Sequence, residues 1–522
     1  APAPRPAELM AAMDAVARAL LLLFQPQVLA VILVAALYGL FVGAIPGLTV
    51  TMAVALFVPF AMFLDPVSAL AAIVTLQAMG IFAGDIPAAL VRMPGTPASA
   101  AYVSDSYALT RQGQGRLVLG VDVLASSFGG LLGAVALMVG APVLAEFALG
   151  FSSYEYLWLA VLGLSSTAFV ASASPAKGAA SVTLGLLLAT VGIDITLGFP
   201  RFTFGIPELL DGVGFIPAMI GLFGFSEVLR GVAAGRAHLS YAPIEPAPVF
   251  VRALRELWRH RVQALRGGLV GLITGVLPGA GADIGAWLAY GVSKRFSKRP
   301  DRYGRGSMEA IVESGVANNS DLAAEWIPTL VFGIPGDSFT AVVLGILMMK
   351  GMRPGPAVLH DYRDVLMAVY MAFVLANLLM VPLGFAAIRA STHILRVPRN
   401  VLLPAIAAVC VVGAFAINNS LFDVGVMLVM GVLGFALESV GFPVAPVVLG
   451  LVLGPLVEQN FMISLIKSEG HLMAFVSRPV SLVLALLTFA VWALPVVSWT
   501  RTRLGPAVAK PSARTVSGGS DA

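Results

Sequence analysis

The sequence is poor in charged residues. Lys, Arg, Asp and Glu make up 11% of its 522 residues, whereas an ordinary soluble domain has about 25%. Hydrophobic residues reach 58%, and the mean hydropathy is +0.92. A soluble chain of this length needs far more surface charge. The composition therefore excludes a soluble enzyme, and much of the apolar surface must face lipid.

The chain also lacks the motifs of common enzyme classes. Its one cysteine, Cys410, excludes a disulfide framework. The five histidines form no H-E-x-x-H pair, and neither a G-x-S-x-G elbow nor a P-loop occurs. The basic residues cluster in loops, where membrane orientation explains them better than nucleic-acid binding. We expect no enzyme activity, no bound cofactor and no nucleic-acid partner, and without a P-loop the chain cannot itself use ATP in that manner.

Long apolar runs dominate the sequence, for example at residues 28–45, 123–143, 156–173, 367–388 and 481–497. Each approaches or exceeds the ~20 residues that cross a bilayer as a helix. Several other apolar segments are too short to cross alone. The pattern predicts an all-α polytopic membrane protein with about 12 transmembrane segments, including re-entrant or broken helices.

Two halves of the chain carry the same motifs in the same order. The pattern G-L-x-x-G-x-x-P-G occurs at residues 39–47 and returns at residues 271–279, an offset of 232. An Ile-Pro followed by Pro-Gly occurs at residues 86–95 and 327–336, an offset of 241. A weaker Gly-Phe-Pro match follows at residues 198–200 and 441–443, an offset of 243. Collinear matches at a nearly constant offset indicate an internal duplication.

Loop charge predicts that the two repeats are inverted. Residues 293–306 carry Lys294, Arg295, Lys298, Arg299, Arg302 and Arg305, whereas their counterpart, residues 60–66, carries no basic residue. By the positive-inside rule the second-half loop is cytoplasmic and the first-half loop is not. Residues 267–292 have basic clusters on both sides and Pro278-Gly279 at their centre, which predicts a re-entrant hairpin or a broken helix.

The predicted organisation has six parts: an N-terminal segment (1–27), membrane repeat 1 (28–229), a basic cytoplasmic linker (230–266), membrane repeat 2 (267–480), a terminal transmembrane helix (481–500) and a disordered cytoplasmic tail (501–522). We expect the N-terminal segment to be retained, because no convincing cleavage site follows its short apolar run. Residues 249–265 set Val251, Leu254, Trp258 and Leu265 against Arg residues. They form either an amphipathic helix on the membrane surface or a plain linker.

The Pro-Gly pairs within apolar segments are the best pointer to a functional site. Non-helical backbone at membrane depth is tolerated where it lines a polar cavity or is buried in protein. Such breaks leave half-helix N-termini that attract anions, and free carbonyls that bind cations. Polar residues near the breaks are Thr49, Thr51, Gln77, Asp85, Arg92, Thr96 and Ser99 in the first half, and Asp283, Asn318, Asn319, Ser320, Asp337, Ser338 and Thr340 in the second.

Each of these polar residues also has a structural explanation. A single Ser or Thr more often holds two helices together than binds a ligand, whereas for Asn318, Asn319 and Ser320 we favour a functional role. Asp85 and Arg92 lie seven residues apart and share a face if the helix between them is unbroken. They pair with each other, or Arg92 contacts an anionic substrate; pairing is the commoner outcome at membrane depth.

Several motifs follow one another in a characteristic order. They are G-x-x-P-G-L-T at residues 43–49, Pro94-Gly95, R-F-T-F-G at 201–205, G-V-L-P-G-A-G at 275–281, Asn318-Asn319, G-I-P-G at 333–336 and N-N-S-L-F-D at 418–423. With these motifs the sequence resembles the large membrane subunit of tripartite tricarboxylate transporters, the TctA family, over roughly residues 28–497.

The resemblance implies a multi-pass permease of the bacterial inner (cytoplasmic) membrane. It would work with a small membrane subunit and with a periplasmic solute-binding protein that delivers a carboxylate, and Na⁺ or H⁺ would drive uptake. The chain departs from the family pattern at Asp85, where a small polar residue is expected, and at Arg92, where an Asn commonly stands. An added cation at Arg92 is compatible with a different or more highly charged carboxylate.

The expected site residues combine the breaks with the resemblance. Substrate binding is expected at Gly47, Thr49, Arg92, Pro94, Gly95, Thr96, Gly279, Asn318, Asn319, Gly336, Asp337 and Ser338. Ion binding is expected at Asn318, Asn319, Ser320, Thr49 and Ser99, and hinges or hairpin breaks at Gly43, Pro46, Gly275, Pro278 and Pro335. The rival functions are a passive channel and a membrane-embedded enzyme or scaffold. A channel would conduct without saturation, and an enzyme would need a catalytic constellation that the sequence does not show.

Overall fold

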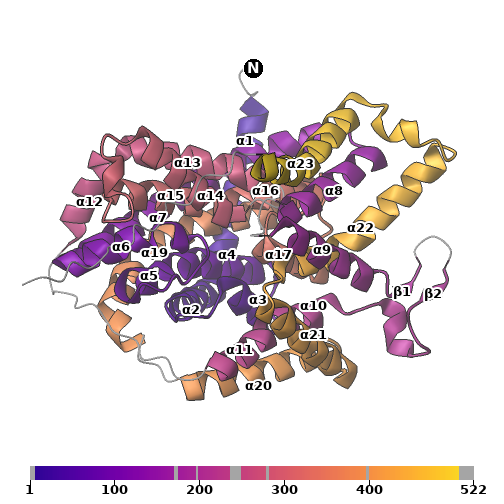
Figure 1. Ribbon diagram of the computed structural model, residues 1–522, viewed down its shortest axis with the longest axis horizontal. Helices are drawn as coiled ribbons and strands as arrows, with labels where there is room; N and C mark the ends of the chain where they lie inside the picture. The colour runs from indigo at the N-terminus through magenta and orange to yellow at the C-terminus, as the bar shows by residue number, and fades with distance from the viewer. Residues whose placement is uncertain are drawn as a thin grey trace, which may run out of the picture.

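The protein is a bundle of helices (Figure 1). The computed structural model describes residues 6–169, 174–194, 198–234, 249–277, 281–394 and 399–504. Within them the strands are β1 (Gly192–Ile193) and β2 (Pro200–Arg201), which pair antiparallel in a short hairpin. The hairpin projects from the bundle and is tied back by two hydrogen bonds from Arg201 to Glu458, of 2.7 and 3.0 Å.

The first half of the chain forms helices that begin repeatedly at proline. Pro26, Pro66 and Pro175 each open a helix, where the missing N–H costs nothing and the fixed φ suits the first turn. The helices are α1 (Pro6–Leu23), α2 (Pro26–Gly43), α3 (Val50–Met62), α4 (Pro66–Ala83), α5 (Asp85–Val91), α6 (Val103–Leu109), α7 (Gly115–Ala148), α8 (Ser153–Phe169), α9 (Pro175–Ala189), α10 (Phe215–Met219) and α11 (Ser226–Ala234).

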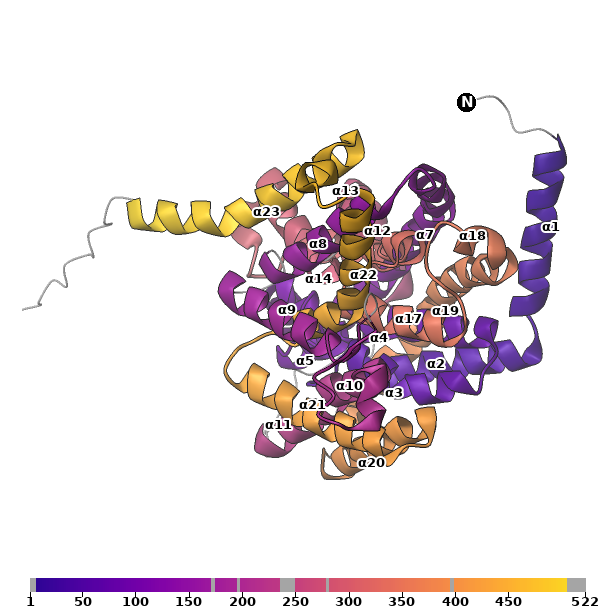
Figure 2. The ribbon, with the colours of Figure 1, turned by 90° about the vertical axis from the view of Figure 1, so that its right-hand side faces the viewer.

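The second half continues with α12 (Phe250–Arg259), α13 (Arg261–Val276), α14 (Gly281–Phe296), α15 (Met308–Ala324), α16 (Trp326–Phe332), α17 (Ser338–Met349), α18 (Val358–Asp361), α19 (Arg363–Ile394), α20 (Arg399–Asn418), α21 (Leu421–Ser439), α22 (Ala445–Lys467) and α23 (Pro479–Leu504). Figure 2 shows α1 and α23 on opposite sides of the bundle. Of the expected tail, 501–522, the structure describes only residues up to Leu504; the rest lies outside the described residues, as do residues 235–248 of the linker.

Eight segments of the described chain are long and apolar enough to cross a membrane: Pro26–Gly43, Pro66–Val91, Val103–Ala148, Phe215–Ala233, Arg363–Ser391, Val401–Asn418, Leu421–Ser439 and Ala445–Lys467. Shorter apolar helices are Val50–Met62, Pro175–Ala189, Ser338–Met349 and Pro479–Ala493. The expectation of an all-α, multi-pass membrane protein is therefore confirmed. The number of crossings and the inverted topology stay predictions.

The helices break where the Pro-Gly motifs stand. Residues 44–49 separate α2 from α3, and Gly47 there has a φ of 94°, which a residue with a Cβ rarely adopts. The break between α13 and α14 includes Pro278 and Gly279, which lie outside the described residues. The two helices beside it pack on each other and on α15. This agrees with the broken helix or hairpin expected for residues 267–292.

The breaks at the ends of α5 and α16 have the same backbone geometry. Each helix has seven residues, and each ends in a left-handed residue: Arg92 (φ 58°) and Gly333 (φ 67°). The next amide donates to the equivalent proline carbonyl in each, Met93 to Pro87 and Ile334 to Pro328. A left-handed conformation is ordinary for glycine but strained for arginine.

Close helix packing also recurs at matching positions. A Cβ on Gly39 would lie 2.7 Å from the Leu76 carbonyl oxygen, and one on Gly271 would lie 2.2 Å from that of Ala317. Further along, a Cβ on Gly43 would lie 2.2 Å from the oxygen of Gly80. One on Gly275 would lie 2.7 Å from the oxygen of Asp321. Glycine lets α2 lie against α4, and α13 against α15, at backbone distance.

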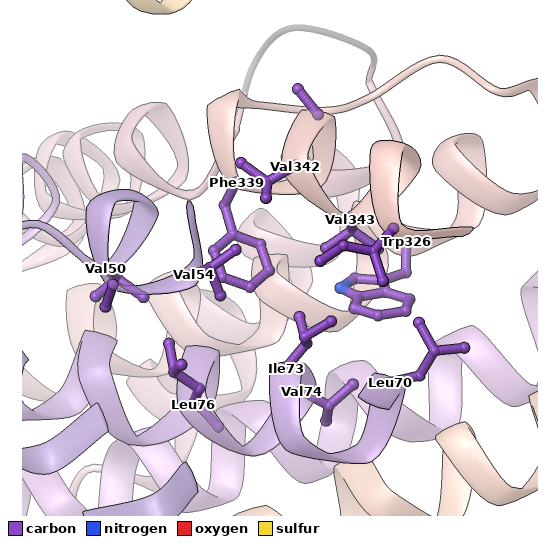
Figure 3. Packing of buried hydrophobic residues seen from close by; sticks show 14 of the residues in the cluster. Val50, Val54, Leu70, Ile73, Val74, Leu76, Trp326, Phe339, Val342 and Val343 are labelled. Atoms are coloured by element: carbon purple, nitrogen blue, oxygen red, sulfur yellow. The ribbon is translucent and has the colours of Figure 1, made fainter. Parts of the chain in front are cut away.

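The core is built around α4 and α15, helices that are buried on nearly every side. Helix α4 also packs on α19 of the second half, and α15 packs on α7 of the first half. Figure 3 shows Trp326 of α16 and Val343 of α17 lying over Leu70, Ile73 and Val74 of α4. The two halves therefore share one core, which brings breaks from both halves to the same place.

Of the two alternatives for residues 249–265, an amphipathic helix or a plain linker, the structure has a helix, α12, at Phe250–Arg259. Its exposed apolar side chains include Val251, Leu254 and Trp258, and Ala253 is buried against the bundle. Its position on a membrane surface stays a prediction. The preceding helix α11 continues through Arg230, and α13 starts at Arg261. The ends of the predicted linker are therefore helical.

Candidate functional site

Two helix N-termini, one from each half, meet at the centre of the molecule. Helix α3 starts after Thr49, whose Oγ1 accepts a hydrogen bond from the Met52 amide at 3.1 Å. Helix α17 starts after Asp337, which forms a capping box with Thr340. Such caps fix where a helix begins. The hydroxyls of Thr51 and Ser338 lie 3.3 Å apart, so the two helix starts are in direct contact.

A small cavity lies at this junction, and we call it the central cavity. Its volume is about 280 Å³, close to the lower limit for small-molecule sites of roughly 300 Å³. Its walls come from the start of α3 (Thr49, Val50, Thr51), from the α4 side chain of Gln77, from the segment after α5 (Gly95, Thr96) and from the start of α17 (Asp337, Ser338, Phe339). Breaks from both halves thus line one space.

Five of the expected substrate residues line the central cavity: Thr49, Gly95, Thr96, Asp337 and Ser338. Gly47 lines a neighbouring cavity of about 140 Å³ that shares two charged residues with it. The sequence therefore located the breaks on both sides of the cavity. Gly279 lies outside the described residues, but Gly281 beside it is close to Asp337, since a Cβ there would lie 3.0 Å from that of Asp337.

Charged side chains at the edge of the cavity come from elements that the sequence did not single out. Arg230 of α11 lies 2.7 Å from Glu227 and also forms an ion pair with Glu438 at the end of α21. All three line the central cavity. The sequence assigned Arg230 to the linker and gave no local signal for the carboxylates. The Gly-Phe-Pro match at residues 441–443 lies next to Glu438, but it gave no indication that this segment reaches the cavity.

The segment after α5 is fixed by hydrogen bonds between Thr96 and Ser99. The Ser99 amide donates to Thr96 Oγ1 at 3.1 Å, and Ser99 Oγ donates to the Thr96 carbonyl at 2.8 Å. Ser99 is fully buried and does not line the cavity. Its contacts support Thr96 in the cavity wall, and ion binding by Ser99 stays a prediction.

The packing around Gly95 depends on the absence of a side chain. A Cβ on Gly95 would lie 2.5 Å from Gly84 Cα and 3.0 Å from the Gly43 carbonyl oxygen. In the second half, a Cβ on Gly336 would lie 2.8 Å from Glu325 Cβ. Gly95 lines the cavity, whereas Gly336 does not. Both glycines allow a helix break to pack against the preceding helix.

A buried hydrogen-bond network joins the halves beneath the cavity. Gln77 Nε2 donates to Glu325 Oε1 at 2.7 Å, and Trp326 Nε1 donates to Gln77 Oε1 at 3.1 Å. Gln77 reaches the cavity from α4, and the other two residues stand at the α15–α16 junction. Because both ends of the Gln77 amide are used, this network fixes its orientation.

The polar run on α15 lies inside the bundle and not on the cavity wall. Asn319 donates to the Gly315 carbonyl at 3.2 Å, and Ser320 donates to the carbonyl of Gly268 at 3.1 Å. Both residues and Asn318 are fully buried, while Leu322 of the same helix reaches the cavity. Their proposed role as ion ligands stays a prediction.

The expected ion pair between Asp85 and Arg92 does not form. Asp85 is buried and accepts a hydrogen bond from Tyr102 at 2.8 Å, whereas Arg92 is exposed. No ion pair of the described residues joins the two. The left-handed backbone at Arg92 ends α5, so the two side chains do not share a helix face. Arg92 does not line the central cavity, and neither does Pro94.

Broken helices from both halves around one cavity, within a multi-pass helical protein, are typical of a membrane transport protein. A family model described as "Tripartite tricarboxylate transporter TctA family" matches residues 29–449. The chain belongs to this family and is a membrane subunit of a tripartite tricarboxylate transporter. The family's name implies partner subunits.

Two relatives come from Agrobacterium vitis. The chain is 33% identical to an uncharacterized 52.8 kDa protein in the TAR-I ttuC′ 3′ region, over 86% of this chain and 89% of that protein. It is 35% identical to an uncharacterized protein in the TAR-II ttuC′ 3′ region, over 40% of this chain and 87% of that protein. No solved structure matches the chain.

Proposed function

We propose that this chain is the permease of a secondary uptake system that imports a tricarboxylate or a related carboxylate across the bacterial inner membrane. A periplasmic solute-binding protein delivers the substrate, a small membrane subunit completes the system, and a Na⁺ or H⁺ gradient drives it. Family membership supports the class of transporter and the need for partners. The central cavity supports the kind of substrate.

The observation that carries the proposal is the meeting of two helix N-termini at the central cavity. The Met52 amide of α3 and the Phe339 and Thr340 amides of α17 are bonded to their cap residues, Thr49 and Asp337. The amides before them, of Val50 and Thr51 in α3 and of Ser338 in α17, have no carbonyl one turn earlier and are the ones that an anion can use. The helix dipoles add positive potential at the same point. The hydroxyls of Thr51 and Ser338 offer further donors to a carboxylate.

The charges around the cavity explain why a cation would accompany the substrate. Asp337, Glu227 and Glu438 line the cavity together with one cationic residue, Arg230, which already pairs with both glutamates. A substrate with several carboxylates would add negative charge to this site. Cations that enter with it would offset the repulsion, which favours symport over passive entry.

We further propose inverted repeats and alternating access. The matching glycine contacts of α2–α4 and α13–α15, and the matching ends of α5 and α16, support a duplicated unit. The basic loop at residues 293–306 supports opposite orientations. In such a fold, the paired breaks would move the substrate between the two faces by motion of one unit against the other.

Uptake of labelled citrate into proteoliposomes tests the proposal. The full chain is reconstituted with the small subunit and the binding protein, and Na⁺ and pH gradients are imposed separately. We expect saturable uptake that needs the binding protein and responds to at least one gradient. Unsaturable flux without the binding protein would instead indicate a channel, and uptake indifferent to both gradients would refute secondary transport.

A matched pair of serine variants locates the site. Ser338→Ala removes a hydroxyl from the cavity wall, and Ser477→Ala removes an exposed hydroxyl that bonds only within its own turn. We expect the first to raise KM for citrate and the second to leave uptake unchanged. Equal effects of the two substitutions would contradict the proposed location.

A further inference from the structure

Two buried carboxylates face each other beside the central cavity. Asp85 at the start of α5 and Asp122 in the middle of α7 are 3% and 1% exposed. They lie within hydrogen-bonding range of each other. Tyr102 donates to Asp85 Oδ1 at 2.8 Å, but Asp85 Oδ2 and both Asp122 oxygens receive no hydrogen bond from the described residues.

A third polar group with no partner points to the same place. Asn318 of α15 is fully buried beside the Tyr102 hydroxyl, and neither atom of its amide makes a hydrogen bond with the described residues. The backbone of Gly315, one turn earlier, leaves space for Asp122, since a Cβ there would lie 2.9 Å from Asp122 Oδ1. The glycine of α15 thus allows Asp122 to lie close to the α15 backbone.

No cationic side chain of the described residues forms an ion pair with Asp85 or Asp122. Helix α4 carries no titratable residue. The other acids on the helices packed around the pair have partners of their own: Asp105 accepts from the amides of Gly304, Gly306 and Ser307, Glu313 pairs with Arg266, and Asp321 accepts from Thr274. The remaining titratable or charged side chains that the structure describes on those elements are Arg363, Asp364, Tyr370 and Arg389 of α19, Arg116 and Glu146 of α7, Tyr107 of α6, Glu309 of α15, Glu325 beside α16, and Arg111. None of these makes a hydrogen bond or ion pair with Asp85 or Asp122.

Two adjoining carboxylates without a cation cannot both stay ionised when water is excluded. A proton between them removes the repulsion and supplies the missing donor. We propose that Asp85 and Asp122 form the coupling site of this transporter, holding one proton when buried and releasing it when water reaches them. This inference rests on the proposed function and narrows its coupling ion to H⁺.

The pair is mechanically linked to the cavity. Asp85 directly follows Gly84, whose carbonyl accepts the Gly95 amide at 3.1 Å. Tyr102 lies three residues after Ser99, which holds Thr96 in the cavity wall. A change in the protonation of the pair therefore acts on both segments that carry Gly95 and Thr96, and a substrate there acts back on the pair.

Infrared titration of the purified full chain in lipid nanodiscs tests the shared proton without any substrate. We expect a protonated carboxyl band at neutral pH that is lost in Asp85→Asn and in Asp122→Asn. Glu155→Gln is the matched control, because Glu155 is equally buried but is paired with Arg478 at 2.8 Å. A band that survives both asparagine substitutions, or no band at all, overturns the proposal.

Citrate transport by the complete system tests coupling. With one coupled proton, an imposed gradient of about one pH unit raises the accumulation ratio by about tenfold. We expect the Asp122→Asn variant to show no rise in the citrate accumulation ratio with the pH gradient, while it still exchanges citrate without a gradient. The Glu155→Gln variant should show the same tenfold rise as the wild type. If accumulation follows a Na⁺ gradient alone, the proton site is refuted. If the wild type neither exchanges nor accumulates citrate, the proposed substrate fails, and the infrared result still decides the proton site.

Discussion

Replacing Gly95 by alanine tests whether the first-half break must pack against backbone. The new Cβ would lie 2.5 Å from Gly84 Cα and 2.7 Å from the Gly84 oxygen. Ordinary contact begins at 3.4 Å, so the two segments must separate by about 0.9 Å. The φ of Gly95 is not in the left-handed region, so the expected effect is steric only.

The expected cost is that of overpacking a rigid contact, about 1–3 kcal/mol. This free energy corresponds to a change of about 5- to 150-fold in the equilibrium between the conformation with this contact formed and the conformation without it. Because the contact lies in the cavity wall, citrate uptake should fall by a factor in this range, while membrane insertion stays normal. Gly291→Ala is the control, since nothing lies within 4 Å of a Cβ there. Uptake by Gly95→Ala within twofold of the control would refute the reasoning.

Three further predictions concern packing and pairing. Gly271→Ala should lower the unfolding temperature in detergent, because its Cβ would lie 2.1 Å from Ser320 Oγ. Gly291→Ala should stabilise the protein by roughly 0.5–1 kcal/mol, because alanine has the higher helix propensity. Equal unfolding temperatures of the two variants would contradict this. Thr51→Val combined with Ser338→Ala should show a coupling of about 0.5–1.5 kcal/mol in citrate binding, and additive effects would argue against the hydroxyl contact. Arg266→Gln should destabilise the protein by about 3 kcal/mol in denaturant titration, because it leaves the fully buried Glu313 without its ion-pair partner. Glu313→Gln should lower the free energy of unfolding by less than this. The reverse order of the two variants would be inconsistent with the ion pair.

The sequence alone determined the class of the protein and the positions of its breaks. Hydropathy is a sum over local composition, so long apolar runs identify membrane helices without knowledge of the fold. Pro46 and Gly47 lie in the break after α2, and Pro335 and Gly336 lie in the break after α16. Proline cannot continue a helix and glycine weakens one, so these breaks follow from local backbone chemistry. Thr49 and Asp337 act as caps on the residues that follow them. Each of these effects depends only on residues close together in the chain, so the sequence is enough to predict them.

The tertiary structure decided which of these positions meet. Thr51 and Ser338 touch although 287 residues separate them, and Arg230 reaches the cavity from a segment that loop charge had assigned to the linker. Asp85 lies beside Asp122 and not beside Arg92, because α5 ends in a left-handed residue at Arg92 and α7 packs against α5. Such contacts follow from how whole helices pack, and no pattern within one segment carries that information.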